Sequence, residues 1–307
     1  MRWPWIIAIL LCLLSNTRAQ QSEKPVTIDD LLAAAQDWAN ENLDDEALAL
    51  LNDVDRDRLR AFLVDLENRF QTNSVYDLAP LRAPAKDFVE FLEQWEETLP
   101  LANWLKTRLD YLDVAEELKR AAPARNKSAP PNVLPPPTLS LERTVWDRQF
   151  ERRPFPTKAD NYVPKLKRIF RAEKTPPELI WVAEVESSFN PDARSPVGAA
   201  GLFQLMKPTA ESYGLSTLLP DDRTNPEKNA HAAAKYMRHL HDRFGDWSLA
   251  LAAYNAGETR VDNLLRKFAA RDYPSIANKL PAETQMYVPK CEAAVQRREG
   301  LSLAELK

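Results

Sequence analysis

Apolar residues recur along this chain at intervals of three and four positions, and no long run alternates with a period of two. This spacing predicts helices throughout, and therefore an all-α protein. In the first part of the chain we expect helices near residues 27–38, 44–70, 85–97 and 101–120. In the second part we expect them near residues 165–171, 209–213, 226–244, 247–256, 261–268 and 282–298.

One further predicted helix carries a carboxylate within its apolar face. Thr175 as N-cap and Pro176 at the first helical position predict its start, and Pro191, which disfavours helical geometry at Asn190, predicts its end. Glu186 then falls in the last turn, on the face formed by Leu179, Val182 and Ala183. Because burial disfavours the ionised form, we expect a raised pKa, as in a general acid. The alternative is a structural carboxylate paired with an arginine.

The loop from Pro191 to Gly201 follows this helix and contains the first glycine of the chain, Gly198, out of only six. Glycine permits sharp bends and close approach of a ligand to the backbone. Ser195 and Gln204 add neutral hydrogen-bonding groups beside the acid. A buried acid, a tight loop and neutral polar side chains suit an uncharged, hydroxyl-rich substrate such as a sugar.

Several short motifs resemble those of one enzyme family. ESSFNP at 186–191, SPVGA at 195–199 and GLFQ at 201–204 resemble the catalytic signature of lytic transglycosylases of the soluble type, which cleave peptidoglycan. AYNAG at 253–257 and ETQMYV at 283–288 resemble two further signatures of that family, in the same order. Flanking segments resemble the membrane-bound lytic transglycosylase D type, although the wall-binding repeats and the lipid-attachment cysteine of that type are not found in this sequence.

The resemblance implies a lysozyme-like helical catalytic domain, preceded here by a separate helical domain. It also implies non-hydrolytic cleavage of the β-1,4 bond between N-acetylmuramic acid and N-acetylglucosamine, with formation of a 1,6-anhydromuramoyl end and no cofactor. In such enzymes one glutamate, here Glu186, acts as acid and then as base, and a tyrosine, here Tyr287, hydrogen-bonds it. The expected substrate-binding residues are Ser195, Gln204, Tyr254, Asn255 and Tyr287.

Three alternatives stay open at this point. Tyr287 could be a core residue, and Ser195 could serve only the turn. A lysozyme-type hydrolase on the same fold could use Asp192 or a positioned water as its second group. The chain could also be a non-catalytic scaffold that binds the cell wall.

Composition divides the chain into four predicted segments: a signal peptide (1–19), an acidic helical domain of unknown role (20–122), a proline-rich linker (123–138) and the catalytic domain (139–307). Residues 21–120 hold 11 basic and 23 acidic side chains, a net charge of −12, whereas residues 121–307 carry 28 basic and 22 acidic groups. The acidic segment is interpreted as a helical bundle with a solvated surface, or as a module that docks a protein partner. The linker is expected to be an extended spacer.

The N-terminal 19 residues have the pattern of a secretory signal: Arg2, an apolar run too short for a membrane span, and a small-residue cleavage site at Ala19. We therefore expect export to the periplasm or the cell wall, with no stable membrane span after cleavage. Cys12 lies inside the apolar run, so Cys291 would be the single cysteine of the mature chain and no internal disulfide is expected.

The partners expected from the sequence are peptidoglycan glycan strands and, for the acidic segment, a possible protein. The basic run 165–171 has neither a motif nor interleaved aromatic residues, so we predict no nucleic-acid binding. The three histidines, His231, His239 and His241, lack the spacing of a HExxH metal pair, so we predict no metal site.

Overall fold

The computed structural model describes residues 56–93, 99–122, 134–195, 197–218 and 220–306. These residues form helices and isolated bridges only, which confirms the all-α fold class for the described part of the chain. None of the helices in that part is long and apolar enough to cross a membrane. The predicted signal peptide and the helix expected near 27–38 lie outside the described residues, as do much of the helix expected from 44 and most of the linker.

The N-terminal helices are α4 (Arg56–Gln71), α5 (Arg82–Leu92) and α6 (Leu99–Ala121), with a 3₁₀ segment η1 (Val75–Leu81) before α5. The rest of the chain forms α7 (Leu139–Arg152), η3 (Ala159–Asn161), α8 (Val163–Ala172), η4 (Pro177–Trp181), α9 (Val182–Ser187), α10 (Lys207–Ser212), η5 (Asp222–Thr224), α11 (Pro226–Phe244), α12 (Trp247–Ala256), α13 (Glu258–Lys267), α14 (Tyr273–Ile276), η6 (Ala277–Lys279), α15 (Ala282–Glu299) and η7 (Leu303–Glu305).

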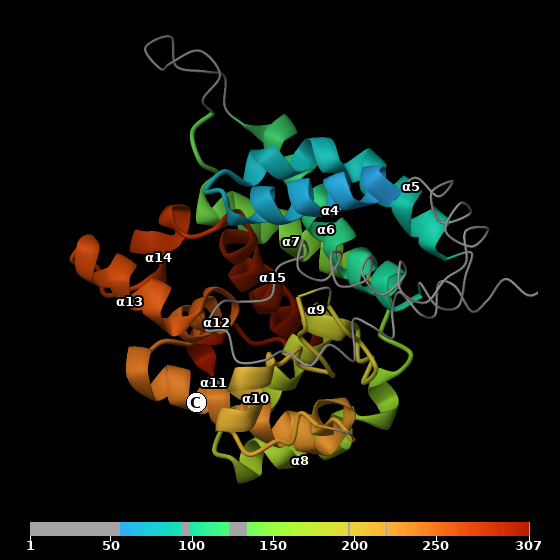
Figure 1. The fold of residues 1–307 in the computed structure, drawn as a ribbon. Coiled ribbons are helices and arrows are strands. Elements are labelled where there is room, and N and C mark those ends of the chain that lie inside the picture. The colour runs from blue at the N-terminus through green and yellow to red at the C-terminus, as the bar shows by residue number, and fades with distance from the viewer. Residues whose placement is uncertain (1–55, 94–98, 123–133, 196, 219, 307) are drawn as a thin grey trace, which may run out of the picture.

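The C-terminal helix α15 lies at the centre, with α7, α9 and α12 around it (Figure 1). Met286, Tyr287, Cys291 and Val295 are all buried, so several faces of this helix contact other elements. Pro289 lies in its interior, beyond the first turn. Cys291 is free and buried.

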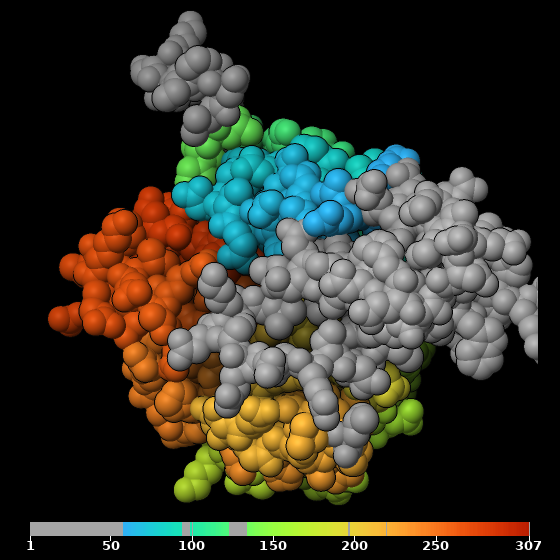
Figure 2. Space-filling model, viewed as in Figure 1, coloured from blue at the N-terminus to red at the C-terminus, as the bar shows by residue number. Residues whose placement is uncertain are grey.

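The helices α4–α6 form a layer that packs on α7 and α15 (Figure 1). The backbone N–H of Ala282, at the start of α15, donates to the Thr72 carbonyl at 2.6 Å, and Gln285 Nε2 donates to Asn73 O at 2.9 Å. Figure 2 shows residues of this layer against the C-terminal helices at the surface. Apolar residues of both parts belong to one buried cluster, while the predicted domain boundaries stay predictions.

Capping residues set the predicted boundaries of the later helices. Asn225 accepts from the backbone N–H groups of Glu227 and Lys228 at the start of α11, and Gly245 (φ +72°) ends that helix. Asp246 then caps α12 through the Leu249 N–H. These chain positions were the ones expected from the sequence.

The predicted start of the helix around Glu186 is wrong. Thr175 is buried and donates its hydroxyl proton to the Ala234 carbonyl at 2.9 Å, so it ties the segment to α11 instead of capping a helix. Pro176 occupies the cap position of the 3₁₀ segment η4, and the α-helix begins only at Val182. The Thr175 hydroxyl, which the sequence pattern predicted to cap a helix, instead makes a tertiary hydrogen bond to Ala234.

Candidate active site

Glu186 lies in the last turn of α9, as the sequence predicted, and its carboxyl group faces α15. The hydroxyl of Tyr287 donates to Glu186 Oε1 at 2.7 Å, so the hydrogen bond implied by the family resemblance is present. The chain leaves α9 through Ser188 (φ +51°) and Phe189 (φ +58°), two non-glycine residues in the left-handed region. Such strained backbone conformations persist only where the surrounding structure holds them in place, and they cluster at functional sites.

The carboxyl of Glu186 has a raised pKa, about 7, mainly because burial disfavours the charged form. The residue keeps partial solvent exposure, although protein surrounds the carboxyl group. The Tyr287 hydrogen bond and the positive charges of Arg108 and Lys290 lower the pKa, and the negative charge of Glu283 raises it. Near neutral pH this group is therefore poised between acid and base, as general acid–base catalysis requires.

Glu184, two residues earlier, has a different environment and a different role. It is buried and accepts two hydrogen bonds from Arg298, at 3.0 Å from Nε and 2.8 Å from Nη2. This bidentate pair stabilises the packing of α9 on α15. The arrangement considered for Glu186, a structural carboxylate paired with an arginine, is therefore the one that Glu184 adopts.

The loop after α9 is held by a buried arginine. Arg223, which is 2% exposed, donates to the carbonyls of Gly198 (2.7 Å) and Leu205 (3.0 Å) and pairs with Asp221. Gly201 (φ +85°) packs so closely on the Arg223 backbone that a Cβ atom there would overlap the Arg223 carbonyl oxygen. These contacts fix the loop beside Glu186.

The two polar loop residues singled out in the sequence use their side chains largely within the loop. Ser195 Oγ accepts from the Ala199 N–H at 2.9 Å, which closes a turn. Gln204 (φ +47°) donates from Nε2 to the carbonyls of Ala193 and Gly201 at 3.0 and 2.9 Å. Both residues remain partly exposed, and they shape the loop that borders the acid.

Tyr254 and Asn255, at the end of α12, approach the same region from the other side. The Tyr254 hydroxyl donates to the Phe203 carbonyl at 2.6 Å, and Asn255 Oδ1 accepts from Thr284 Oγ1 at 2.6 Å. Burial raises the pKa of Tyr254 well above its usual value, and the charge of Glu186 adds to this effect. The structure thus brings Glu186, Tyr254 and Tyr287 together, and Asn255 adjoins them.

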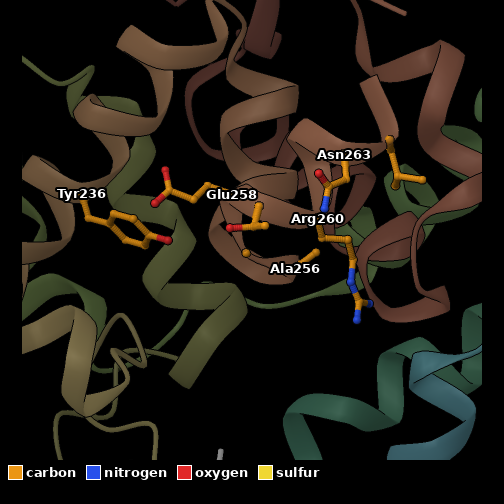
Figure 3. Close-up of a pocket in the computed structure, with 8 residues that line it drawn as sticks. Tyr236, Ala256, Glu258, Arg260 and Asn263 are labelled. Carbon is orange, nitrogen blue, oxygen red and sulfur yellow. The ribbon is translucent and has the colours of Figure 1, made fainter. Parts of the chain in front are cut away.

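Two pockets are lined by residues that neighbour the site residues along the chain. The first pocket, of about 570 Å³, is lined by Tyr236 and by residues that follow Tyr254 and Asn255 in the chain. These include Glu258, Arg260 and Asn263 at the start of α13 (Figure 3). A second, of about 470 Å³, lies between α6 and the end of α9 and is lined by Val185, Ser188 and the 153–158 connection. Glu186 itself lines neither pocket.

Sequence reasoning missed the contribution of α6. Arg108 and Tyr111 of this helix are electrostatically coupled to the Glu186–Tyr287 region, although nothing in their local sequence marks them. Glu283 and Lys290 were inside or beside a recognised motif, which was the available signal for them. Asp192, the second carboxylate considered for a hydrolase, is exposed near the start of the loop.

The histidines have separate surroundings. His231 Nδ1 lies 2.7 Å from Glu173 Oε1, His239 Nε2 lies 3.4 Å from Glu258 Oε2, and His241 stacks on Trp247 with ring centroids 4.1 Å apart. Among the described residues, no group of three or more histidine, cysteine, aspartate or glutamate side chains is arranged to hold a metal ion.

Part of this chain is similar to known proteins. The transglycosylase SLT domain family matches residues 167–276, which include Glu186, Ser195, Gln204, Tyr254 and Asn255. Membrane-bound lytic murein transglycosylase D of Escherichia coli K12 is 37% identical over 139 residues, covering 43% of this chain and 30% of that protein. Soluble lytic murein transglycosylase of the same organism is 33% identical over 165 residues, covering 49% of this chain and 24% of that protein.

The chain therefore spans less than a third of the length of these relatives. Among solved structures, the 70 kDa soluble lytic transglycosylase of Escherichia coli is 20% identical over 95% of this chain and 61% of its own, with a TM-score of 0.42. Residues 167–276 thus form a transglycosylase SLT domain, homologous to those of membrane-bound lytic transglycosylase D and soluble lytic transglycosylase.

Proposed function

We propose that this chain is a peptidoglycan lytic transglycosylase that acts in the periplasm or at the cell wall. It would cleave the β-1,4 bond between N-acetylmuramic acid and N-acetylglucosamine and leave a 1,6-anhydromuramoyl end. The observation that carries the proposal is Glu186: a carboxyl with a pKa raised to about 7, hydrogen-bonded by Tyr287, within a matched SLT domain. The relatives that match this domain are named lytic murein transglycosylases.

One acid is enough when the substrate supplies its own nucleophile. Protonated Glu186 gives its proton to the glycosidic oxygen as the bond from that oxygen to C1 of the muramic acid breaks. The C6 hydroxyl oxygen of the same sugar then bonds to C1, and its proton passes to the Glu186 carboxylate. The ring closure is intramolecular, so it gains from a high effective concentration, and Glu186 ends in its starting state.

The other site residues receive positioning roles in this proposal. Tyr287 orients the Glu186 carboxyl through its hydrogen bond. Tyr254 and Asn255 form one wall, on which sugar and N-acetyl groups would be bound, and Ser195 and Gln204 hold the opposing loop in shape. No second carboxylate is needed, and Glu184 is neutralised by Arg298.

A lysozyme-type hydrolase is the second candidate, because Asp192 is exposed in the loop that follows Glu186 and could act, directly or through a positioned water, as the second group. Digestion of purified sacculi followed by mass analysis of the released muropeptides separates the two, because the anhydro product is lighter by one water. We expect anhydro products from the wild-type chain. Hydrated products would support the hydrolase instead.

Glu186→Gln should abolish release, with a loss of about 10²–10⁴-fold or more, because the amide cannot donate the catalytic proton. Glu178→Gln, a partly exposed carboxylate in the neighbouring segment η4, is the matched control and should retain wild-type activity. A folded Glu186→Gln chain that still digests sacculi would remove the basis of the proposal. A folded wild-type chain that binds sacculi but never cleaves them would point to a scaffold.

A further inference from the structure

The helix α6 lies outside the matched SLT domain, yet it is fixed against the active site. The connection runs through Lys290 of α15, which is 1% exposed. Its Nζ donates to the Thr107 carbonyl at 3.0 Å, lies 3.6 Å from Asp110 Oδ2 and sits 4.1 Å from the centre of the Tyr111 ring. These contacts hold the backbone of α6 at residues 107–111 in register with the α15 turn that follows Tyr287.

Arg108 lies in the middle of this contact, and its guanidinium is held in one place. Its Cζ lies 4.8 Å from the centre of the Trp104 ring, and Nη1 donates to Thr107 Oγ1 at 2.6 Å. Its Nη2 lies 3.9 Å from Glu283 Oε1, at the outer limit of an ion pair, and the Arg108 side chain is only 15% exposed. An arginine restrained on three sides and largely removed from water exerts a stronger field than a mobile surface cation.

Glu283 lies between Arg108 and the part of α15 that contacts the Glu186 carboxyl. It precedes Tyr287 by one turn of α15, so both side chains lie on the same face of the helix. Tyr287 donates to Glu186, and the charges of Arg108 and Glu283 act on Glu186 with opposite signs. The positive charge favours the carboxylate form of Glu186, and the negative charge favours the acid form.

We propose that Arg108 is a positioning residue of the active site, which together with Glu283 sets the electric field at the Glu186 carboxyl. Helix α6 is then part of the active site, because it supplies this charge. The proposal deepens the proposed function, since a transglycosylase needs Glu186 first as an acid and then as a base. Arg108 stabilises the second form and limits how far burial favours the first.

Other titratable groups also face Glu186 and must stay constant in any test. Tyr287, Lys290 and Cys291 come from α15, Tyr254 from α12 and Tyr111 from α6. Lys290 has the same sign of effect as Arg108, but it also anchors α6. Arg108 is therefore the residue at which the charge can be changed while this anchor remains.

The test is a carbon-13 NMR titration of the Glu186 side chain in the full chain, with Glu186 assigned by loss of its signal in Glu186→Gln. Arg108→Gln should raise the Glu186 pKa by about one pH unit, and Glu283→Gln should lower it. Arg108→Lys should stay near wild type because the charge is kept. Arg120→Gln, which removes an exposed arginine of the same helix, is the control and should cause no change.

Arg108→Met is a second neutral variant, which keeps the packing on Trp104 without the charge. Of Arg108→Gln and Arg108→Met, the variant with the higher melting temperature is titrated. A Glu186 pKa that stays the same or falls in that variant would overturn the proposal, as would an equal shift in Arg120→Gln. A purely structural role for Arg108 would lower the melting temperature without moving the pKa in opposite directions in the Arg108 and Glu283 variants. The titration uses no substrate, so it decides this point even if muropeptide analysis rejects the proposed function.

Discussion

At the scale of single residues, two glutamates two positions apart show how the surroundings assign chemistry. Glu184 is neutralised by the two hydrogen bonds from Arg298, whereas Glu186 has a tyrosine hydroxyl and more distant charges. The sequence pattern placed Glu186 correctly in the last turn of a buried helix. It could not supply the Arg298 pairing, because the two partners are 114 residues apart.

Gly201 offers a prediction at this scale. Gly201→Ala should lower the free energy of unfolding by about 1–2 kcal/mol for the positive φ and by about a further 1–3 kcal/mol for overlap with the Arg223 carbonyl. It should also reduce sacculus digestion, because the loop beside Glu186 must shift. Thermal or denaturant unfolding measures the first effect, and muropeptide release measures the second.

Gly214→Ala is the matched control, since Gly214 has nearly the same φ (+87°) but open space where its Cβ would be. It should lose only the conformational part of the stability and keep its activity. Equal losses of stability in the two variants would contradict the close contact between Gly201 and Arg223.

At the scale of elements, the helices that follow capping residues were predictable, and the segment around Glu186 was only partly so. Asn225, Asp246 and Gly245 act locally, within a few residues, so their effect can be read from the sequence. Thr175 instead bonds Ala234, which is 59 residues away, and the expected helix became a 3₁₀ segment followed by a short α-helix. The docking of α6 on α15 likewise depends on distant partners that carry no local signal.

The α6–α15 contact predicts a pH dependence of stability. Burial lowers the pKa of Lys290 well below its usual value, and the nearby Arg153 and Arg108 lower it further. Above that lowered pKa the unfolded chain binds one more proton at this site than the folded chain. The free energy of unfolding should therefore rise by up to about 1.4 kcal/mol per pH unit, between the folded pKa and about 10.4.

Lys290→Met removes this contribution. The stability of the wild type relative to Lys290→Met should increase as the pH rises through this interval, as measured by urea unfolding at several pH values. Lys279→Met, in the short segment η6, replaces a lysine outside this contact and should show no such trend. A constant difference between wild type and Lys290→Met across the alkaline range would mean that Lys290 is not desolvated in the folded chain.

At the scale of the whole molecule, the region that contains the SLT match and the preceding helical layer share a core, and α6 contacts α9, the helix that carries Glu186. The two parts differ in composition: the chain is acidic before about residue 122 and basic after it. Composition could not show that α6 supplies Arg108 and Tyr111 to the surroundings of the reacting carboxyl.

The most direct test of Glu186 as the acid is the pH dependence of kcat/KM for release of anhydro-muropeptides by the wild-type chain. A general acid must be protonated in the free enzyme, so the rate should be level on the acidic side of its pKa and fall about tenfold per pH unit above about 7. A rate that stays level up to pH 9 while the chain remains folded would contradict the account, because Glu186 would then be ionised throughout most of the active range.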